Sequence, residues 1–352
     1  MDYKKELEDL INISIREGAS DLHVTVGVPP TIRVSGYLIQ LAKKKAMMAD
    51  DTLGILTELL DKDVLKNFLT TKEIDFAYSY GDSRFRGNAY FQQGGIGIAL
   101  RLIPRKVRSF AELNLPPVLE AFSEKQQGFF LVVGPVGHGK TTTLAALIEL
   151  INEQRAEHIV TIEDPIEYIF EPKKSIIDQR EVKFDTKDFN SALVSVFRQD
   201  VDVVMVGEMR GAETMSTAVT AAETGHYILS TLHTNNAAQT IDRIIDTFAA
   251  SQQEQVRMQL ASSLTGIFSQ RLIPRISGGL IPAYELLISN PAVANLIREQ
   301  RTHEINTVIE TGLEQGMVDL NRSLAELVRV GEITAANAYT YSLNPKGLQK
   351  II

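Results

Sequence analysis

The sequence contains no cysteine and no long apolar run. Without cysteine the chain can form no disulfide, no cysteine-ligated zinc site and no cysteine nucleophile. No 18 consecutive residues are apolar, so no helix is predicted to cross a bilayer. The first residues, MDYKKELEDL, are charged and lack the apolar core of a signal peptide. These absences predict a cytoplasmic protein whose association with a membrane would go through a partner or a surface.

Positive charge is also in short supply. The chain has 36 Lys and Arg against 44 Asp and Glu, a formal net charge of −8. Affinity for nucleic acid comes largely from basic side chains that neutralise phosphates, so direct nucleic-acid binding is not expected. The 352 residues are 44% hydrophobic, which suffices for packed cores and suggests about two domains.

The first hundred residues predict a small α/β domain. A helical pattern ends near Gly18, strands are expected at 21–26 and 31–36, and two short helices at about 51–70. Segments 84–92 and 96–103 flank Gly94-Gly95, which predicts a β-hairpin. The proline-rich stretch 104–118 is typical of a linker, so the N-terminal domain is expected over 1–103.

The predicted hairpin places several arginines on one face. If Gly94 and Gly95 form the two-residue turn, Arg101 lies opposite Asn88. Side chains on one face of a hairpin recur at every second position. The arginines that share a face under this alignment are Arg84, Arg86, Arg101 and Arg105. This face is either a solvated outer surface or a source of positive charge for an anionic ligand.

From Gly128 onward the pattern changes to buried strands that alternate with helices. Continuous apolar runs occur at 128–134, 158–163, 202–208 and 226–233. Such runs are typical of a parallel sheet covered on both faces. They predict a RecA-like α/β domain over 119–352. The last hundred residues are expected to be helical, most clearly at 289–300, where Asn290 caps and Pro291 begins a helix.

Residues 134–141 read GPVGHGKT and match the P-loop pattern G-x-x-x-x-G-K-[ST], between a buried strand and a helix. Glycines let backbone N–H groups turn toward phosphate, and the helix N-terminus adds positive charge. Lys140 is expected to reach the β- and γ-phosphates of ATP, and the Thr141 hydroxyl to bind Mg²⁺. The residues expected to contact the nucleotide are Gly134, Pro135, Val136, Gly137, His138, Gly139, Lys140, Thr141 and Thr142.

Hydrolysis also needs a carboxylate at the end of a neighbouring strand. VVMVGE ends in Glu208, with Gly207 where many P-loop enzymes carry a Walker B Asp. TIEDPIE supplies Glu163 after another strand. Glu208 is therefore interpreted as the catalytic carboxylate, and Glu163 as its partner in either water activation or Mg²⁺ ordering. His233 follows a strand where a γ-phosphate sensor would sit, whereas His226 fits a structural role.

Together these segments resemble the secretion-ATPase superfamily and, within it, the retraction ATPases of type IV pili. The resemblance covers essentially the whole chain. It is carried by SDLHVTVGVPPTIRVSG (20–36), GPVGHGKTTT as the Walker A motif, TIEDPIEY as the Asp box, VVMVGEMR as an atypical Walker B motif, GHYILSTLHT as the His box, and AVANLIRE (292–299). Departures from the family pattern include His138 in place of Ser, and Val201 and Gly211 in place of Pro and Asp.

The resemblance implies a PAS-like N-terminal domain, a RecA-like ATPase domain and a ring of six subunits. It also implies that arginines of the N-terminal domain, Arg84, Arg86 and Arg101, complete an ATP site between domains. The expected partner is the polytopic platform protein of the pilus at the inner membrane. The alternatives are an accessory retraction paralogue, a related secretion-system ATPase, a scaffold that binds ATP without turnover, and a DNA-translocating motor. An assembly ATPase fits poorly, because such chains are longer and usually carry a cysteine zinc motif.

Overall fold

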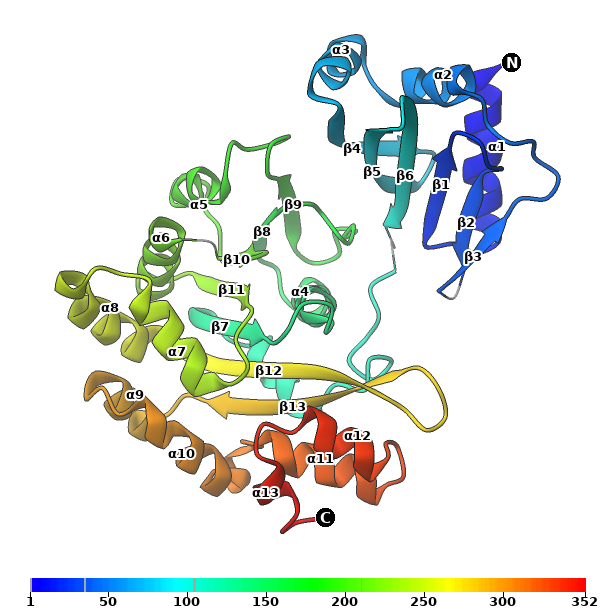
Figure 1. The fold of residues 1–352 in the computed structure, drawn as a ribbon. Coiled ribbons are helices and arrows are strands. Elements are labelled where there is room, and N and C mark those ends of the chain that lie inside the picture. The colour runs from blue at the N-terminus through cyan, green and yellow to red at the C-terminus, as the bar shows by residue number, and fades with distance from the viewer. Residues whose placement is uncertain (1, 35, 104–105, 210) are drawn as a thin grey trace. The chain divides into compact units, whose positions relative to one another are not determined.

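The computed structural model describes residues 2–34, 36–103, 106–209 and 211–352. The chain divides into two compact units: residues 1–106 with 167–169, and residues 107–166 with 170–352 (Figure 1). No helix in the described ranges combines the length and the apolar character needed to cross a bilayer. Each unit has its own sheet and its own buried core.

The N-terminal unit is an antiparallel sheet with three helices packed on it. Its sheet order is β3-β2-β1-β6-β5-β4. The elements are α1 Tyr3–Arg16, β1 Asp21–Thr25, β2 Thr31–Val34, β3 Tyr37–Gln40, α2 Ala49–Leu59, α3 Lys62–Thr71, β4 Glu73–Tyr80, β5 Ser83–Gln92 and β6 Gly95–Ile103. Its core joins residues of α1, such as Leu10, to sheet residues such as Leu22 and Ile98. The two predicted strands and both short helices are present, while β3 had no clear signal.

The hairpin exists, but its turn differs from the prediction. Gln92 pairs with Gly95 and Arg86 with Arg101, so the two turn residues are Gln93 and Gly94. Both have positive φ, as a type I′ turn requires. The expected pairing of Arg101 with Asn88 is therefore wrong. Because the register changes by two positions, and side chains alternate with a period of two, the arginines still share a face. Arg105 lies outside the described residues.

The C-terminal unit is built around a seven-stranded sheet of order β13-β12-β7-β11-β10-β8-β9. Every neighbouring pair is parallel except β12 and β13. Its strands are β7 Gly128–Val133, β8 His158–Glu163, β9 Ile176–Glu181, β10 Val203–Val206, β11 Tyr227–Leu232, β12 Leu264–Pro274 and β13 Leu280–Ile288. The α/β class and the alternation of buried strands with helices match the sequence-based expectation.

Helices cover this sheet and follow it to the C-terminus (Figure 1). They are α4 Lys140–Gln154, α5 Phe189–Val196, α6 Ala212–Glu223, α7 Ala237–Asp246, α8 Ala250–Ser263, α9 Pro291–Arg298, α10 Ile305–Thr311, α11 Leu320–Arg329, α12 Ala335–Tyr341 and α13 Pro345–Leu348. Short 3₁₀ turns occupy Pro117–Phe122, Thr302–Glu304 and Leu313–Gln315. Phe129, Leu131 and Val133 of β7 belong to the core formed with α5–α8, and α4 also packs on β7.

The expectation of a wholly helical C-terminus is wrong for residues 264–288. These residues form the β12–β13 hairpin, which extends the sheet beyond β7. Its turn contains Gly278 and Gly279, both at positive φ. Short apolar runs do not separate strand from helix by periodicity alone, so the glycine pair was the usable signal. The predicted α9 begins as expected: the Asn290 side chain accepts from the Val293 N–H, and Pro291 is the first helical residue.

Candidate nucleotide-binding site

The P-loop lies between β7, whose residues are all buried, and the N-terminus of α4. Gly134, Gly137 and Gly139 all have positive φ, the conformation that favours glycine. A Cβ on Gly134 would come 2.3 Å from the Gln270 carbonyl oxygen of β12. The loop is therefore packed directly against β12, and its first glycine is required by that close approach as well as by its φ angle.

The remaining predicted loop residues take distinct places. Val136 projects outward with 78% of its surface exposed. Pro135 and His138 are half-buried, and Thr141 and Thr142 are half-buried in the first turn of α4. A helix N-terminus preceded by a glycine-rich turn is a ready anion site, since its N–H groups have no partner within the helix.

Lys140 is only 7% exposed, and its ammonium group points into the loop. Nζ donates to the carbonyl oxygens of Gly134 and Pro135, each at 2.9 Å. It also lies 3.2 Å from Nδ1 of His233. An ammonium group has no acceptor, so Nδ1 accepts here and the neutral imidazole carries its proton on Nε2. The loop thus holds the positive charge where a phosphate oxygen could take over these hydrogen bonds.

The same histidine faces a carboxylate. Nε2 of His233 lies 3.6 Å from Oε2 of Glu208. The imidazole therefore stands between the Lys140 ammonium group and the Glu208 carboxylate. His233 follows β11 directly, and Glu208 follows β10, its parallel neighbour. Parallel strands end at the same edge of the sheet, which is why residues from separate segments meet.

Glu163 ends β8 and is 3% exposed. Its Oε1 accepts from the Thr161 hydroxyl at 2.6 Å and from the Gln179 amide at 3.3 Å, which fixes its orientation. In the register of β8 and β10, Glu163 lies beside Gly207. A Cβ on Gly207 would meet the Ile162 carbonyl oxygen at 3.3 Å and Cγ of Glu163 at 4.0 Å. Glu163 thus lies in contact with the position from which a Walker B Asp side chain at 207 would extend.

Hydrogen bonds from β12 hold the P-loop, and sequence reasoning did not identify the residues that make them. The buried Gln270 amide donates to the His138 carbonyl oxygen at 2.9 Å, and its Oε1 accepts from the Thr143 hydroxyl at 2.6 Å. The Leu272 N–H donates to Nδ1 of His138 at 2.9 Å. Gln270 lies more than 125 positions along the chain from these partners, and no local motif marks it.

The arginines of the N-terminal unit have different surroundings. Arg101 donates from Nε to Oδ1 of the buried Asp21 at 2.8 Å. Burial raises the pKa of the Asp21 carboxyl, but hydrogen bonds from Ser20 and Arg101 outweigh it and hold the pKa below its ordinary value. Arg84 is half-buried. Arg86 is exposed and, within the described ranges, forms no ion pair, whereas the exposed Arg101 is held by Asp21.

The contacts of His226 agree with a structural interpretation. Its Nδ1 lies 3.2 Å from the Ala221 carbonyl oxygen, and its ring meets Phe197 edge-on with centroids 5.3 Å apart. Its contacts differ from those of His233, which lies at the other end of β11.

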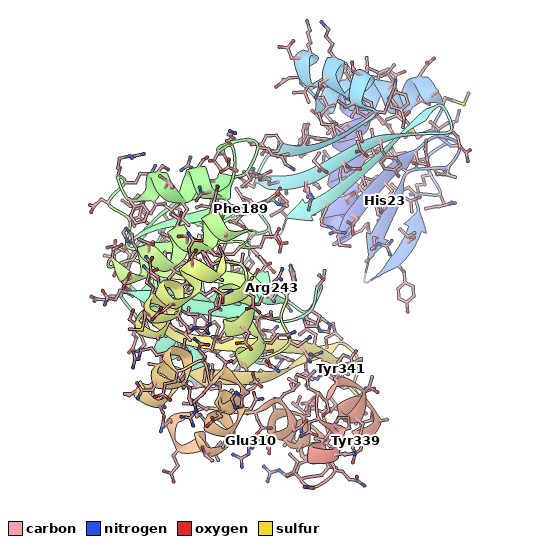
Figure 2. All side chains as sticks on the ribbon, turned by 60° about the vertical axis from the view of Figure 1, so that its left-hand side comes forward. His23, Phe189, Arg243, Glu310, Tyr339 and Tyr341 are labelled. Carbon is pink, nitrogen blue, oxygen red and sulfur yellow. The ribbon has the colours of Figure 1, made fainter. Side chains whose placement is uncertain are left out.

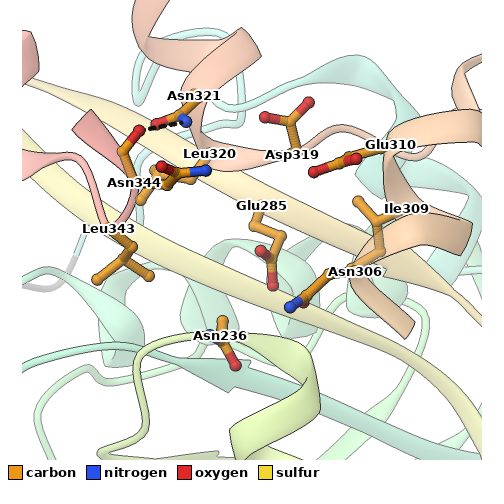
Figure 3. A pocket seen from close by; sticks show the side chains of 10 residues that line it. All are labelled: Asn236, Glu285, Asn306, Ile309, Glu310, Asp319, Leu320, Asn321, Leu343 and Asn344. Atoms are coloured by element: carbon orange, nitrogen blue, oxygen red, sulfur yellow. Dashed lines mark hydrogen bonds between the residues drawn. The ribbon is translucent and has the colours of Figure 1, made fainter. Parts of the chain in front are cut away.

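A separate cavity of about 210 Å³ lies in the same unit, lined by Glu285, Asp319, Glu310 and several asparagines (Figure 3). Glu285 is 7% exposed, and its Oε1 accepts from the Ala237 N–H that begins α7. Burial, together with the charge of Asp319, raises the pKa of Glu285 to about 7. None of the P-loop residues lines this cavity.

The chain is similar to known proteins over most of its length. The family model described as type II/IV secretion system protein matches residues 4–279. The chain is 42% identical over 334 residues to the type IV pilus retraction ATPase PilT of Pseudomonas aeruginosa, covering 95% of this chain and 97% of that protein. It is 43% identical over 321 residues to a twitching motility protein of Neisseria gonorrhoeae, covering 91% and 86%.

A solved structure is equally similar. The crystal structure of the pilus retraction motor PilT with bound ADP superposes with a TM-score of 0.92 at 43% identity, covering 98% of both chains. The likeness therefore extends through both units and includes the segments that carry the P-loop, Glu163, Glu208 and His233.

Proposed function

The chain belongs to the type II/IV secretion system protein family, and we propose that it is an ATP-hydrolysing motor that drives retraction of type IV pili. The observation that carries the proposal is a complete P-loop in which Lys140 contacts His233 and His233 faces Glu208. The chain that holds it is similar over nearly its full length to a retraction motor that binds ADP. Twitching motility is the cellular process that such a motor would serve.

We propose that the P-loop backbone and Lys140 hold the phosphates of ATP. The Lys140 ammonium group exchanges the carbonyl oxygens of Gly134 and Pro135 for phosphate oxygens, which neutralises charge on the transferred group. Lys140 then withdraws from His233, so the hydrogen bonding of the imidazole depends on whether phosphate is bound. This links occupancy of the loop to the position of Glu208 through a single side chain.

The residues at this edge of the sheet also fit Mg²⁺. They offer oxygen donors, the Thr141 hydroxyl and the carboxylates of Glu208 and Glu163, which are the ligands that Mg²⁺ prefers. Over the described ranges no three His, Cys, Asp or Glu residues form a metal cluster, as expected where phosphate supplies further ligands. When bound, Mg²⁺ would neutralise phosphate charge. Glu208 would then orient the attacking water and accept its proton, and the hydrogen bonds to Glu163 would keep its carboxylate in place.

Further parts of the proposal concern assembly. We propose a homohexamer in which Arg84, Arg86 and Arg101 supply positive charge to the γ-phosphate. Each subunit would consist of an N-terminal PAS-like domain over 1–103, a linker over 104–118 and an ATPase domain over 119–352. The motor would act from the cytoplasm on the platform protein of the pilus at the inner membrane, with no direct role for nucleic acid. The net charge of −8 and the arginine face of β5 and β6 support these points.

A deletion strain tests the proposal. Pili are counted, and their retraction is followed, after complementation with the wild type, Lys140→Ala or Glu208→Gln. Abundant but static pili that only the wild type restores to retraction would support a retraction motor. Loss of all pili would instead identify an assembly role, and unchanged pili an accessory or unrelated secretion role.

Purified proteins separate binding from turnover. Lys140→Ala is expected to lose ATP binding, whereas Glu208→Gln is expected to bind ATP without hydrolysing it. ATP binding by the wild type without turnover would favour a nucleotide-dependent scaffold. Retained hydrolysis in Glu208→Gln would contradict the role assigned to that carboxylate.

A further inference from the structure

The imidazole of His138 in the P-loop accepts a hydrogen bond from β12 at a point that β7 does not reach. β7 pairs with β12 only as far as Val133 and Ser269, whereas β12 continues to Pro274. Beyond Ser269 no described strand lies along that edge of β12, so the backbone N–H of Leu272 has no strand partner there. Nδ1 of His138 accepts this N–H at 2.9 Å. The His138 side chain thereby satisfies an N–H group that a neighbouring strand would otherwise bind.

The same residue is fixed at its backbone. The Gln270 amide donates to the His138 carbonyl oxygen, and Gln270 also binds Thr143 in α4. Position 138 is thus tied to β12 through both its side chain and its carbonyl, next to Gly139, which precedes the first residue of α4. On its other side the ring meets Tyr341 of α12 edge-on, with centroids 6.4 Å apart (Tyr341 is labelled in Figure 2).

The hydrogen bond from Leu272 requires a neutral ring. A protonated imidazole carries N–H on both nitrogens and could not accept from Leu272. Burial, aided by the positive charges of Arg271 on β12 and Lys140 on α4, lowers the pKa of His138 below its ordinary value. From α12 the facing group is the Tyr341 ring. The neutral form is therefore the one that the fold selects.

We propose that His138 is a positioning residue that latches the P-loop to β12 through its neutral imidazole, and that protonation of this ring releases the latch and weakens nucleotide binding. The proposal rests on the proposed nucleotide binding by the loop and adds a regulatory input to it. Because the pKa of His138 is lowered in the folded state, the latch is complete above the ordinary histidine pKa of about 6.5 and is lost as the pH falls through the lowered pKa.

The test compares ADP affinities of the full-length protein and its variants, measured by calorimetry from about pH 8 to about pH 4.5, a range that extends well below the ordinary histidine pKa because the pKa of His138 is lowered. Three variants are informative. His138→Ala removes the acceptor. His138→Asn keeps an acceptor oxygen near the position of Nδ1 but does not titrate. His303→Asn is the matched control, because the His303 side chain is 77% exposed and lies in the same unit.

At about pH 8 we expect His138→Ala to bind ADP roughly fivefold more weakly than the wild type, the effect of one lost hydrogen bond, and His138→Asn to bind nearly as well. On acidification the wild type should lose roughly fivefold more affinity than His138→Asn, since only the wild type loses the latch. Protonation of ADP is common to both proteins and cancels in this comparison. In steady-state turnover His138→Ala should raise KM more than it lowers kcat.

The proposal is overturned if His138→Ala binds like the wild type at high pH, or if wild type and His138→Asn weaken in parallel on acidification. Thermal unfolding without nucleotide should show for His138→Ala a loss of about 1 kcal/mol, the effect of one hydrogen bond, and almost none for the other two variants, which would exclude a general folding defect. Lys140→Ala distinguishes the proposed nucleotide site from the proposed role of His138. Absence of ADP binding by the wild type itself would count against the nucleotide site, whereas binding that depends on Lys140 but not on His138 would count against the latch alone.

Discussion

Restoring an aspartate at position 207 is expected to harm this protein, although many P-loop enzymes carry an acid there. Gly207 lies beside Glu163, and a Cβ at 207 would stand 4.0 Å from Cγ of Glu163. Glu163 is 3% exposed and already receives hydrogen bonds from Thr161 and Gln179. In Gly207→Asp a second carboxylate would lie beside that of Glu163.

The size of the effect follows from Coulomb's law. Two carboxylates about 5 Å apart at an effective dielectric constant of about 20 repel by about 3 kcal/mol. Gly207→Asn adds nearly the same volume without charge, so the difference between the two variants isolates the repulsion. The Cβ itself, 3.3 Å from the Ile162 carbonyl oxygen, should cost both variants about 1 kcal/mol through crowding.

Urea unfolding of both variants measures this difference. At about pH 8 the Asp variant should be about 3 kcal/mol less stable than the Asn variant. Repulsion raises the pKa of a carboxyl in the folded state, so the deficit should shrink as the pH falls and one carboxyl takes up a proton. ATP turnover of the Asp variant should fall below that of the Asn variant. Equal stability at pH 8, or Mg²⁺-dependent turnover above the wild type in Gly207→Asp, would refute the idea that Glu163 replaces the Walker B acid.

Three further outcomes follow from the described contacts. Glu285→Gln should keep the hydrogen bond from Ala237 and should be about 3 kcal/mol more stable than the wild type above about pH 7, but nearly equal to it near pH 4.5. The reason is that the raised pKa of Glu285 makes the wild type lose stability as the pH rises between these values. Parallel pH dependences of the free energy of unfolding, measured in denaturant, would contradict this. Gly134→Ala should lose ADP affinity at least tenfold, since its Cβ would meet the Gln270 carbonyl oxygen at 2.3 Å, and calorimetry checks it. Arg101→Ala should destabilise the N-terminal unit by about 1 kcal/mol by removing the partner of Asp21, whereas Arg86→Ala should leave thermal stability unchanged; equal losses would place both arginines in structural roles.

Local pattern was enough to predict much of this chain. The P-loop, the buried strands before it and before Glu163, and the capped helix at Pro291 depend on residues close in sequence, and the structure has them where expected. The β5–β6 hairpin was also predicted, but its two-residue turn lies one position earlier in the chain than expected. Gln93 adopts positive φ in place of Gly95. A Cβ on Gly95 would lie 2.9 Å from Cγ2 of Val26. Local pattern therefore predicted the hairpin but not which two residues form its turn.

The sequence by itself determined which residues could perform the chemistry, because phosphate binding needs a glycine-rich loop with Lys and Thr at a fixed spacing. Only the tertiary structure decided how they are coupled. The alignment of parallel strand ends brings His233 between Lys140 and Glu208 and sets Glu163 beside Gly207. The β12–β13 hairpin, predicted as helix, supplies Gln270 and the Leu272 N–H that hold the P-loop. These pairings join segments up to more than a hundred residues apart, so no local periodicity encodes them; they exist because the strands of one sheet share an edge.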